Sequence, residues 1–154
     1  MTITYEITDQ ILTDRYTVVV RGEMPTGEFA GWLREGYRSV FEYLAAAGIV
    51  PSGPPFARYT FLGGAVAVEA GVPVPHEVAG QGRVEPSTLP DGHAAVTVHT
   101  GRYEDLDKAY EALNRWLKDH DHSPAGPHWE IYFTDPSTEP DPARWRTEVV
   151  MPYR

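Results

Sequence analysis

The sequence contains the same succession of elements twice, and this repetition constrains the fold more than any single motif. A β-branched strand precedes an apolar helical stretch from about Glu28 to Ala47, which ends at Gly48. Another strand precedes a second helical stretch from Tyr103 to about His120, and two strands follow each helix. This order predicts an α+β fold of two pseudo-symmetric βαββ repeats, with two helices and a largely antiparallel sheet. We expect the strands at 16–21, 56–61, 65–70, 94–99, 128–134 and 145–151.

The repeats align in three blocks. The strands after the helices align at an offset of 72 residues, which places Arg58 on Glu130, and the last strands align at 79, which places Glu69 on Glu148. We therefore expect one domain over residues 1–154, with repeat 1 at about 3–78 and repeat 2 at about 84–154. The helices align at an offset of 73: Leu33 on Leu106, Tyr37 on Tyr110, Val40 on Leu113 and Leu44 on Leu117.

The composition argues against several classes of protein. The net charge of −9 is unfavourable for binding nucleic acid, because phosphate binding needs clustered Lys and Arg. The chain has no cysteine, which excludes disulfides, thiol catalysis and the usual structural zinc ligands. The N-terminus lacks a signal-peptide pattern, and no apolar run is long enough to span a bilayer. We therefore expect a cytoplasmic protein that contacts neither nucleic acid nor membrane.

Motifs for metals, phosphates and nucleophilic serine are also missing from the sequence. His120, His122 and His128 lie close together, but histidines at i and i+2 do not share a helix face, so we interpret them as part of an exposed helix end. The glycines match neither GxGxxG after a strand nor GxxxxGK, and no serine lies in a GxSxG turn. Gly31 and Gly36 inside the first helix indicate either close packing or a mobile helix. We expect no metal and no cofactor.

A carboxylate interrupts the largely apolar strand at 128–134. Alternation puts Trp129, Ile131 and Phe133 on one face of this strand, and Glu130 and Tyr132 on the other. Two interpretations remain open for the second face. It is either solvated, or it lines a cavity in which the Glu130 charge and nearby aromatic rings bind an organic cation. The pattern also leaves open which face the helices cover.

The second half contains a run with the skeleton G-x-Y-x-x-L-x-x-A-Y-x-x-L-x-x-W, from Gly101 to Trp116. It is followed by E-x-Y-x-x-D-P at Glu130–Pro136, then by Trp145-Arg-Thr-Glu-Val149 and Pro152. Together these motifs resemble the GyrI-like small-molecule-binding domain, which also occurs as the effector-binding domain of AraC-type and MerR-type multidrug-responsive regulators. The resemblance covers the second half closely and the first half through the repeat. We expect Asp135-Pro136 to form the turn that ends the strand.

The resemblance implies a ligand groove at the junction of the two βαββ repeats. It implies that Glu130 is the buried acid that meets cationic ligands, and that Trp145 helps to form an aromatic pocket. Arg58 is expected either to pair with Glu130 in the empty state or to select anionic parts of a ligand. For Tyr37 and Tyr110, core packing is an equal alternative to a place in the pocket wall. The expected ligand-binding residues are Glu130, Tyr132, Trp145, Tyr37, Tyr110, Trp32 and Arg58.

The resemblance favours a protein that binds hydrophobic, often cationic aromatic compounds as a sensor or by sequestration. The alternative is a hydrolase that opens the cyclopropane ring of genotoxic natural products, with Glu130 as general base and a tyrosine as acid. We expect binding rather than catalysis. A topoisomerase-inhibiting interaction module ranks last, because the chain has no contiguous acidic run. No helix-turn-helix precedes the domain, so we expect a stand-alone form; a protein partner or a homodimer is left open.

Overall fold

The computed structural model describes residues 4–134 and 138–154, which form two compact units. The α1 unit is named for its helix α1 (Phe29–Ala47) and comprises Thr13–Asp91. The α2 unit is named for α2 (Leu106–Asp119) and comprises the N-terminal residues up to Leu12 together with Gly92–Arg154. The turn expected at Asp135-Pro136 lies outside the described residues. Neither helix combines the length and the apolar character that a membrane crossing requires, as far as the chain is described.

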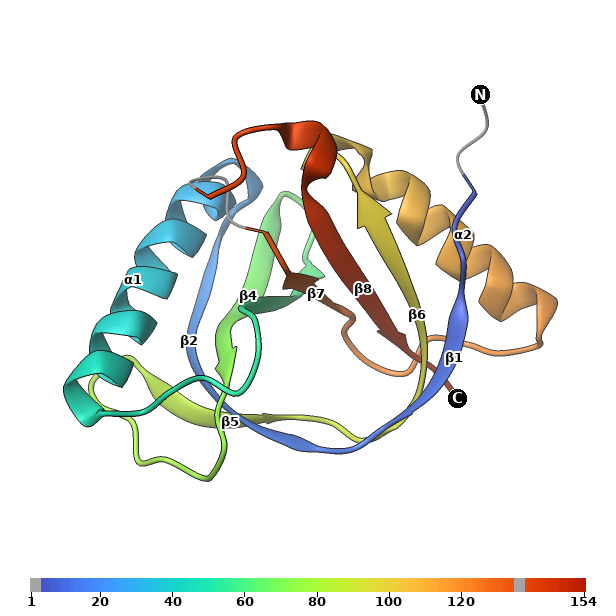
Figure 1. The fold of residues 1–154 in the computed structure, drawn as a ribbon. Helices are drawn as coiled ribbons and strands as arrows, with labels where there is room; N and C mark the ends of the chain where they lie inside the picture. The colour runs from blue at the N-terminus through green and yellow to red at the C-terminus, as the bar shows by residue number, and fades with distance from the viewer. Residues whose placement is uncertain (1–3, 135–137) are drawn as a thin grey trace. The chain divides into compact units, whose positions relative to one another are not determined.

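The α1 unit has the βαββ order that the repeat predicts. Its strands are β2 (Arg15–Pro25), β3 (Phe56–Phe61), β4 (Ala65–Pro73) and β5 (Glu85–Leu89), labelled in part in Figure 1. All pairings are antiparallel: β4 pairs with β2 and β3, and β2 also pairs with β5. The strand order is therefore β3-β4-β2-β5. The helix ends at Gly48 in the left-handed conformation (φ 69°), as the sequence predicts.

The α2 unit repeats this order. Its strands are β1 (Thr8–Leu12), β6 (Gly92–Thr100), β7 (Trp129–Tyr132) and β8 (Arg146–Pro152). A 3-10 turn at Tyr103–Asp105 leads into the helix, and another at Pro142–Arg144 leads into the last strand. β8 pairs antiparallel with β6 and β7, and β6 also pairs with β1, so the strand order is β1-β6-β8-β7. The α+β repeat architecture is thus confirmed.

Two edge strands, β1 and β5, are missing from the sequence prediction. β1 precedes β2 in the chain but pairs with β6, whereas β5 precedes β6 but pairs with β2. Their sequences, TDQIL and EPSTL, are short and mostly polar, and Pro86 lacks the N–H that a central strand would need. Backbone pairing rather than a buried apolar face holds them in the sheet, so hydrophobic alternation could not reveal them.

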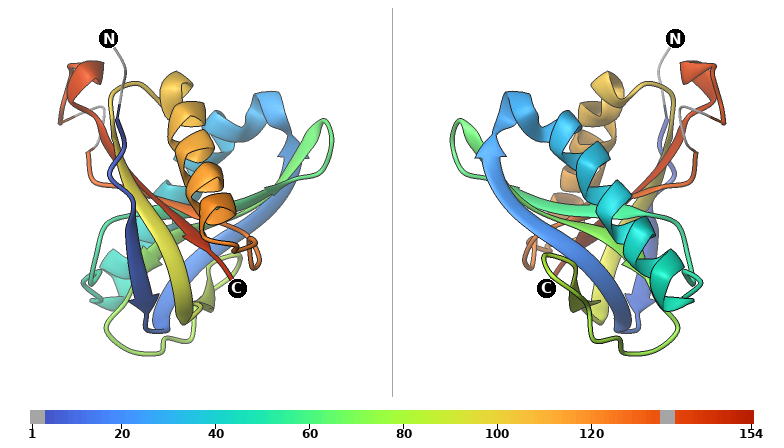
Figure 2. Two further views of the ribbon diagram at one scale, coloured as in Figure 1. Left: turned by 90° about the vertical axis from the view of Figure 1, so that its right-hand side faces the viewer. Right: turned by 90° about the vertical axis from the view of Figure 1, so that its left-hand side faces the viewer.

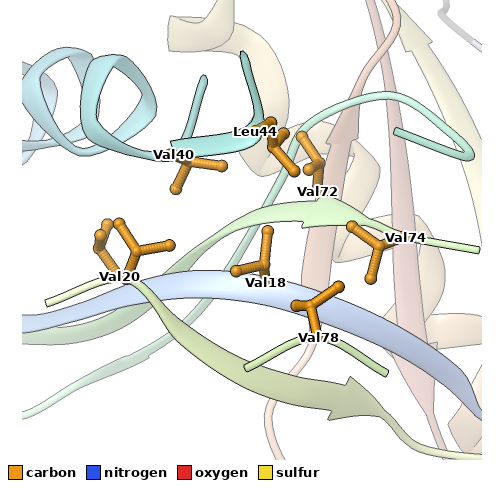
Figure 3. Close-up of a cluster of buried hydrophobic side chains, with 8 residues drawn as sticks. Val18, Val20, Val40, Leu44, Val72, Val74 and Val78 are labelled. Carbon is orange, nitrogen blue, oxygen red and sulfur yellow. The ribbon is translucent and has the colours of Figure 1, made fainter. Parts of the chain in front are cut away.

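Apolar side chains from one stripe of α1 form the core of the α1 unit. Val40 and Leu44 are 0% and 2% exposed and pack against Val18, Val20 and Val72 of the sheet (Figure 3). The right-hand view in Figure 2 shows α1 in front of the strands of its own unit. Burial of such side chains contributes about 1.5–3 kcal/mol each.

The glycines of α1 have different environments. A Cβ added at Gly36 would lie 2.8 Å from Cγ2 of Val20, whereas a Cβ at Gly31 would meet nothing within 4 Å. Gly36 therefore allows close packing of the helix on β2, which decides between the two explanations for that residue. Gly31 has no such packing reason.

The core of the α2 unit is built in the same way. Leu113 and Leu117 are 0% and 1% exposed, and they pack with Val149 and Met151 of β8. These two leucines are the repeat partners of Val40 and Leu44, so the alignment of the helices at an offset of 73 is correct.

The strand ladders correct another part of the sequence alignment. Ala57 stands opposite Ala70 of β4, and Glu130 stands opposite Val149 of β8. Ala70 and Val149 are equivalent at the expected offset of 79, so Ala57, and not Arg58, is the counterpart of Glu130. The offset between β3 and β7 is therefore 73, and the value of 72 is wrong. A slip of one residue moves a side chain to the other face of a sheet, so Arg58 and Glu130 occupy different faces of their own units.

Candidate functional site

Glu130 lies on the face of its sheet that α2 covers. It stands opposite Val149 of β8, which packs with Leu113 of the helix, and residues directly opposite each other share a face. Glu130 is 4% exposed. Of the two interpretations left open by the sequence, the structure thus excludes a solvated face for this residue.

Two tyrosine hydroxyls satisfy the buried carboxylate. Tyr110 of α2 donates a hydrogen bond to Oε2 of Glu130, and Tyr132, two residues further along β7, donates to Oε1 at 2.8 Å. An unpaired carboxylate at this depth would carry a large desolvation cost, which such hydrogen bonds offset. Three of the residues expected from the sequence are therefore brought together in one cluster, which we call the Glu130 cluster.

Aromatic rings continue the Glu130 cluster toward the start of β8. The ring of Tyr132 meets Tyr103 edge-on, with 6.0 Å between the ring centroids. Tyr103 in turn stacks on Trp145, at 4.9 Å between centroids and 28° between planes. Trp145 is fixed by a 2.8 Å hydrogen bond from its Nε1 to the carbonyl oxygen of Glu139. The expected site residue Trp145 is thus linked to Glu130 through two tyrosines.

Gly101 explains how the G-x-Y motif positions the stacked rings of Tyr103 and Trp145. Its φ of 133° lies in the region that side-chain-bearing residues rarely adopt, and it follows β6 directly. The backbone N–H of Gly101 donates to the carbonyl oxygen of Trp145 at 2.8 Å. Gly101 therefore ties the backbone two residues before Tyr103 to the backbone of Trp145, which keeps the two aromatic residues close together.

His128 extends the Glu130 cluster in the other direction. Its ring meets that of Tyr110 edge-on, with 4.8 Å between centroids. Burial lowers the pKa of His128 below its usual value, and the Glu130 carboxylate opposes part of this shift. The imidazole is therefore neutral at pH 7, and it does not supply a positive charge beside Glu130.

His99 of β6 lies on the same face of the sheet as Glu130 and is 2% exposed. Its Nε2 is 2.9 Å from the carbonyl oxygen of Arg102, which can only accept, so Nε2 carries a hydrogen. In the neutral ring Nδ1 then accepts from the hydroxyl of Tyr5 at 2.8 Å. Burial and the charges of Asp105 and Asp107 raise the pKa of Tyr5, which keeps this hydroxyl protonated. The N-terminal segment is thus bonded to the sheet of the α2 unit.

A comparison of the two units shows that this polar face is particular to the α2 unit. Residues can be matched through their partners on the central strands β4 and β8. In four of the six positions, a small or apolar residue of the α1 unit is replaced by a hydrogen-bonding residue in the α2 unit, and in one position a tyrosine is kept. The rows are Val20-Ala70-Ala57 against Thr97-Val149-Glu130, and Gly22-Val68-Tyr59 against His99-Thr147-Tyr132.

Tyr37 and Trp32, two of the expected site residues, belong to the α1 unit. The hydroxyl of Tyr37 donates to the carbonyl oxygen of Phe56 at 2.7 Å. Its repeat partner Tyr110 donates to the carboxylate of Glu130, and the α1 unit has Ala57 at the position of Glu130. The indole of Trp32 lies over Gly22, where an added Cβ would come within 2.7 Å of Nε1.

Arg58 is the remaining expected residue of the α1 unit. It stands opposite Glu69 of β4, on the face away from α1. Glu69 also accepts a 3.3 Å hydrogen bond from Nε of Arg21. Arg58 therefore stands opposite one acidic residue, Glu69, which Arg21 also contacts. Its expected pseudo-symmetric relation to Glu130 is wrong because of the register.

The sequence prediction missed Tyr103, His99 and Thr147 as members of this face. Tyr103 could have been found, because it is the tyrosine of the G-x-Y motif. His99 and Thr147 could not, because only the ladder that places them opposite each other and beside Tyr132 reveals their shared face. Of the histidines expected in an exposed helix end, His120 is exposed and stacks on Trp116 at 4.2 Å between centroids. His128 is half-buried beside Tyr110, so that expectation is wrong for this residue. In the described ranges no three His, Cys, Asp or Glu side chains gather to hold a metal ion.

Aromatic rings around a carboxylate can attract an organic cation through the charge and through cation–π interaction. The family model of the GyrI-like small molecule binding domain matches residues 13–154, and the chain belongs to this family. A search of curated proteins gave no significant match.

Solved structures share the fold at low sequence identity. The EcmrR C-terminal domain has a TM-score of 0.88 at 20% identity, and each chain is covered to 99%. The chain also matches EcmrR in a complex with DNA (TM-score 0.86, 20% identity). This match includes 97% of the present chain but only 57% of the EcmrR chain. A hydrolase from Listeria innocua (TM-score 0.72, 12% identity, coverage 97% and 92%) has the same fold. So does SAV2435 bound to tetraphenylphosphonium (TM-score 0.67, 14% identity, coverage 97% and 94%).

Proposed function

We propose that the protein binds hydrophobic aromatic cations through the Glu130 cluster and acts as a cytoplasmic sensor or sequestering protein for such compounds. The observation that supports this most directly is the burial of Glu130, at 4% exposure, with tyrosine hydroxyls on both of its oxygens. A charge maintained in a buried aromatic environment is costly, and a bound cation offsets that cost by pairing with it.

The residues around Glu130 fit a flat cationic ligand. Tyr103 and Trp145 offer ring faces and edges, Tyr110 and Tyr132 offer ring area together with hydroxyl groups, and burial of apolar ligand surface adds about 25 cal/mol per Å². The structural neighbour SAV2435 binds tetraphenylphosphonium, which supports the same class of ligand. Trp32, Tyr37 and Arg58 of the α1 unit stay proposed as further ligand contacts, on the basis of the sequence.

The test compares two ligands that differ in charge alone. Naphthylmethyl-trimethylammonium is a cation, and its neopentyl isostere, with carbon in place of nitrogen, is neutral. Glu130→Gln should weaken binding of the cation by about tenfold or more and leave the neutral compound nearly unchanged, as measured by tryptophan fluorescence or calorimetry. Equal losses for both ligands would contradict a role for the charge.

Glu148→Gln provides a matched control for this experiment. Glu148 lies on β8, opposite Val98 and Ile131, on the face away from α2. Its removal changes the net charge of the protein in the same way as Glu130→Gln. It should leave both affinities unchanged, so an effect of Glu130→Gln would report on the site and not on net charge.

Hydrolysis of a strained ring is a second candidate function. The observation that favours it is the contact of a buried carboxylate with tyrosine hydroxyls, which pairs a general base with a general acid. Glu130 would take a proton from a water molecule whose oxygen bonds to one carbon of the ring; a C–C bond of the ring would break, and Tyr110 or Tyr132 would donate a proton to the departing carbon. Mass spectrometry of a cyclopropane-containing alkylating compound, incubated with wild type and with Glu130→Gln, would detect the ring-opened product. Equal rates with wild type and buffer would exclude this activity for that compound.

A further inference from the structure

Thr147 has a buried hydroxyl with no hydrogen-bond partner in the described part of the chain. The residue is 0% exposed. It lies on β8, opposite Tyr132 on one side and His99 on the other, and therefore on the same face as Glu130. Buried hydroxyls in proteins are normally hydrogen-bonded, so this exception lies beside the charged group of the proposed ligand site.

The fold itself does not require a hydroxyl at this position. The counterpart of Thr147 in the α1 unit is Val68, which stands opposite Tyr59 and Gly22. Valine has the same branched shape as threonine and suits a strand equally well. The α2 unit thus contains a polar atom where its repeat partner has a methyl group, directly next to the residue that binds Glu130.

Tyr132 connects Thr147 with Glu130. Its hydroxyl donates to Oε1 of Glu130, and its backbone stands opposite Thr147. Displacement of the Tyr132 side chain by a ligand would leave Oε1 without this donor and would uncover the neighbouring hydroxyl. A cation that takes the place of the Tyr132 side chain would meet two hydrogen-bond acceptors, the carboxylate of Glu130 and the hydroxyl of Thr147.

We propose that the Glu130 cluster selects protonated amines over cations without N–H groups, and that Thr147 is the residue that makes this distinction. An ammonium group donates one N–H to Oε1 of Glu130, in place of Tyr132, and another to Oγ1 of Thr147. A quaternary ammonium or phosphonium ion satisfies the charge of Glu130 but leaves Thr147 unpaired. This inference rests on the proposed binding function and names its ligand class.

The experiment uses naphthylmethylammonium and naphthylmethyl-trimethylammonium, which have the same charge and ring but differ in N–H groups. Affinities of both are measured by calorimetry for the full chain and for Thr147→Val. The substitution should weaken the primary ammonium by about threefold to tenfold, the usual effect of one hydrogen bond, and leave the trimethylammonium unchanged. Thr147→Ser retains the hydroxyl and should retain the wild-type preference.

Thr17→Val is the matched control. Thr17 of β2 is 1% exposed, and its hydroxyl likewise lacks a partner among the described residues, but it belongs to the α1 unit. Its removal deletes the same group from an equally buried strand and should change neither affinity. Unfolding of each variant by urea establishes that affinities are compared between folded proteins.

The outcomes separate this inference from the proposed function. If Thr147→Val weakens both cations equally, or weakens neither, while Glu130→Gln weakens both, the selection of N–H groups by Thr147 is wrong and cation binding stands. If wild type binds neither cation, or Glu130→Gln has no effect on either, the proposed function is wrong and the inference is overturned with it.

Discussion

The hydroxyl of Tyr132 donates a 2.8 Å hydrogen bond to Oε1 of Glu130, two residues earlier on the same strand. Because alternate residues of a strand share a face, this contact needs no tertiary partner, whereas the bond from Tyr110 to Oε2 needs the helix. The carboxylate is thus satisfied by one local and one non-local donor.

Removal of either tyrosine hydroxyl should destabilise the protein. Tyr110→Phe and Tyr132→Phe each delete a hydrogen bond to a buried charged group, which contributes about 1.5–3 kcal/mol to the free energy of unfolding. Urea denaturation at pH 7 measures the loss. Tyr16→Phe is the control: Tyr16 is 48% exposed and the change should be close to zero. Losses no larger than that of the control would show that the hydroxyls do not stabilise Glu130.

The two glycines of α1 should respond to alanine with opposite signs. Gly36→Ala places a Cβ 2.8 Å from Cγ2 of Val20 and should destabilise the protein by about 1–3 kcal/mol. Gly31→Ala meets nothing within 4 Å and should stabilise it by about 0.5–1 kcal/mol through helix propensity. Thermal or urea unfolding distinguishes them. Similar changes of one sign would contradict the close packing of the helix on β2 at Gly36.

Stability should depend on pH through His128. Burial lowers the pKa of this histidine in the folded state, so the unfolded state binds more protons below about pH 6.5. The contribution to stability is therefore complete above that pH and is lost as the pH falls toward the lowered pKa of the folded state. His128→Gln should lose less stability than wild type between pH 7.5 and about pH 5.

Urea unfolding at a series of pH values checks this prediction. His76→Gln is the comparison, because His76 lies exposed in the loop after β4 and has no buried ring to protonate. It should follow the wild-type curve. If His128→Gln also follows that curve, His128 does not contribute to the loss of stability in acid.

The stacked pair of Tyr103 and Trp145 should contribute to ligand affinity. Trp145→Leu removes an aromatic face next to the Glu130 cluster and should weaken naphthyl cations by about twofold to tenfold, the range for one aromatic contact. Trp116→Leu is the control, since Trp116 lies near the C-terminal end of α2 and stacks on His120. A larger effect of Trp116→Leu on affinity would place the ligand elsewhere.

Much of the fold could be predicted from the sequence because its helices and central strands bury continuous apolar faces. Val40, Leu44, Leu113 and Leu117 recur at helical spacing, and each is almost fully buried. The alternation along the strand at 128–134 allows Glu130 to be either solvated or buried, and the family resemblance favours burial. The edge strands could not be predicted, because they are held by backbone pairing that leaves no hydrophobic period.

The repeat and the order of elements follow from local periodicity, and the motif around Glu130 singles out this residue as the proposed site acid, so the amino-acid sequence is sufficient for these predictions. The tertiary structure decided the register, and with it the faces of Arg58, Ala57 and Thr147. Offsets of 72 and 73 residues between β3 and β7 give nearly equal sequence similarity. They differ by one residue, which is half the period of a strand, so the choice between them reverses the face on which every side chain lies. Which polar groups share a face with Glu130 is therefore a property of the hydrogen-bonded ladder and not of the pattern within any one strand.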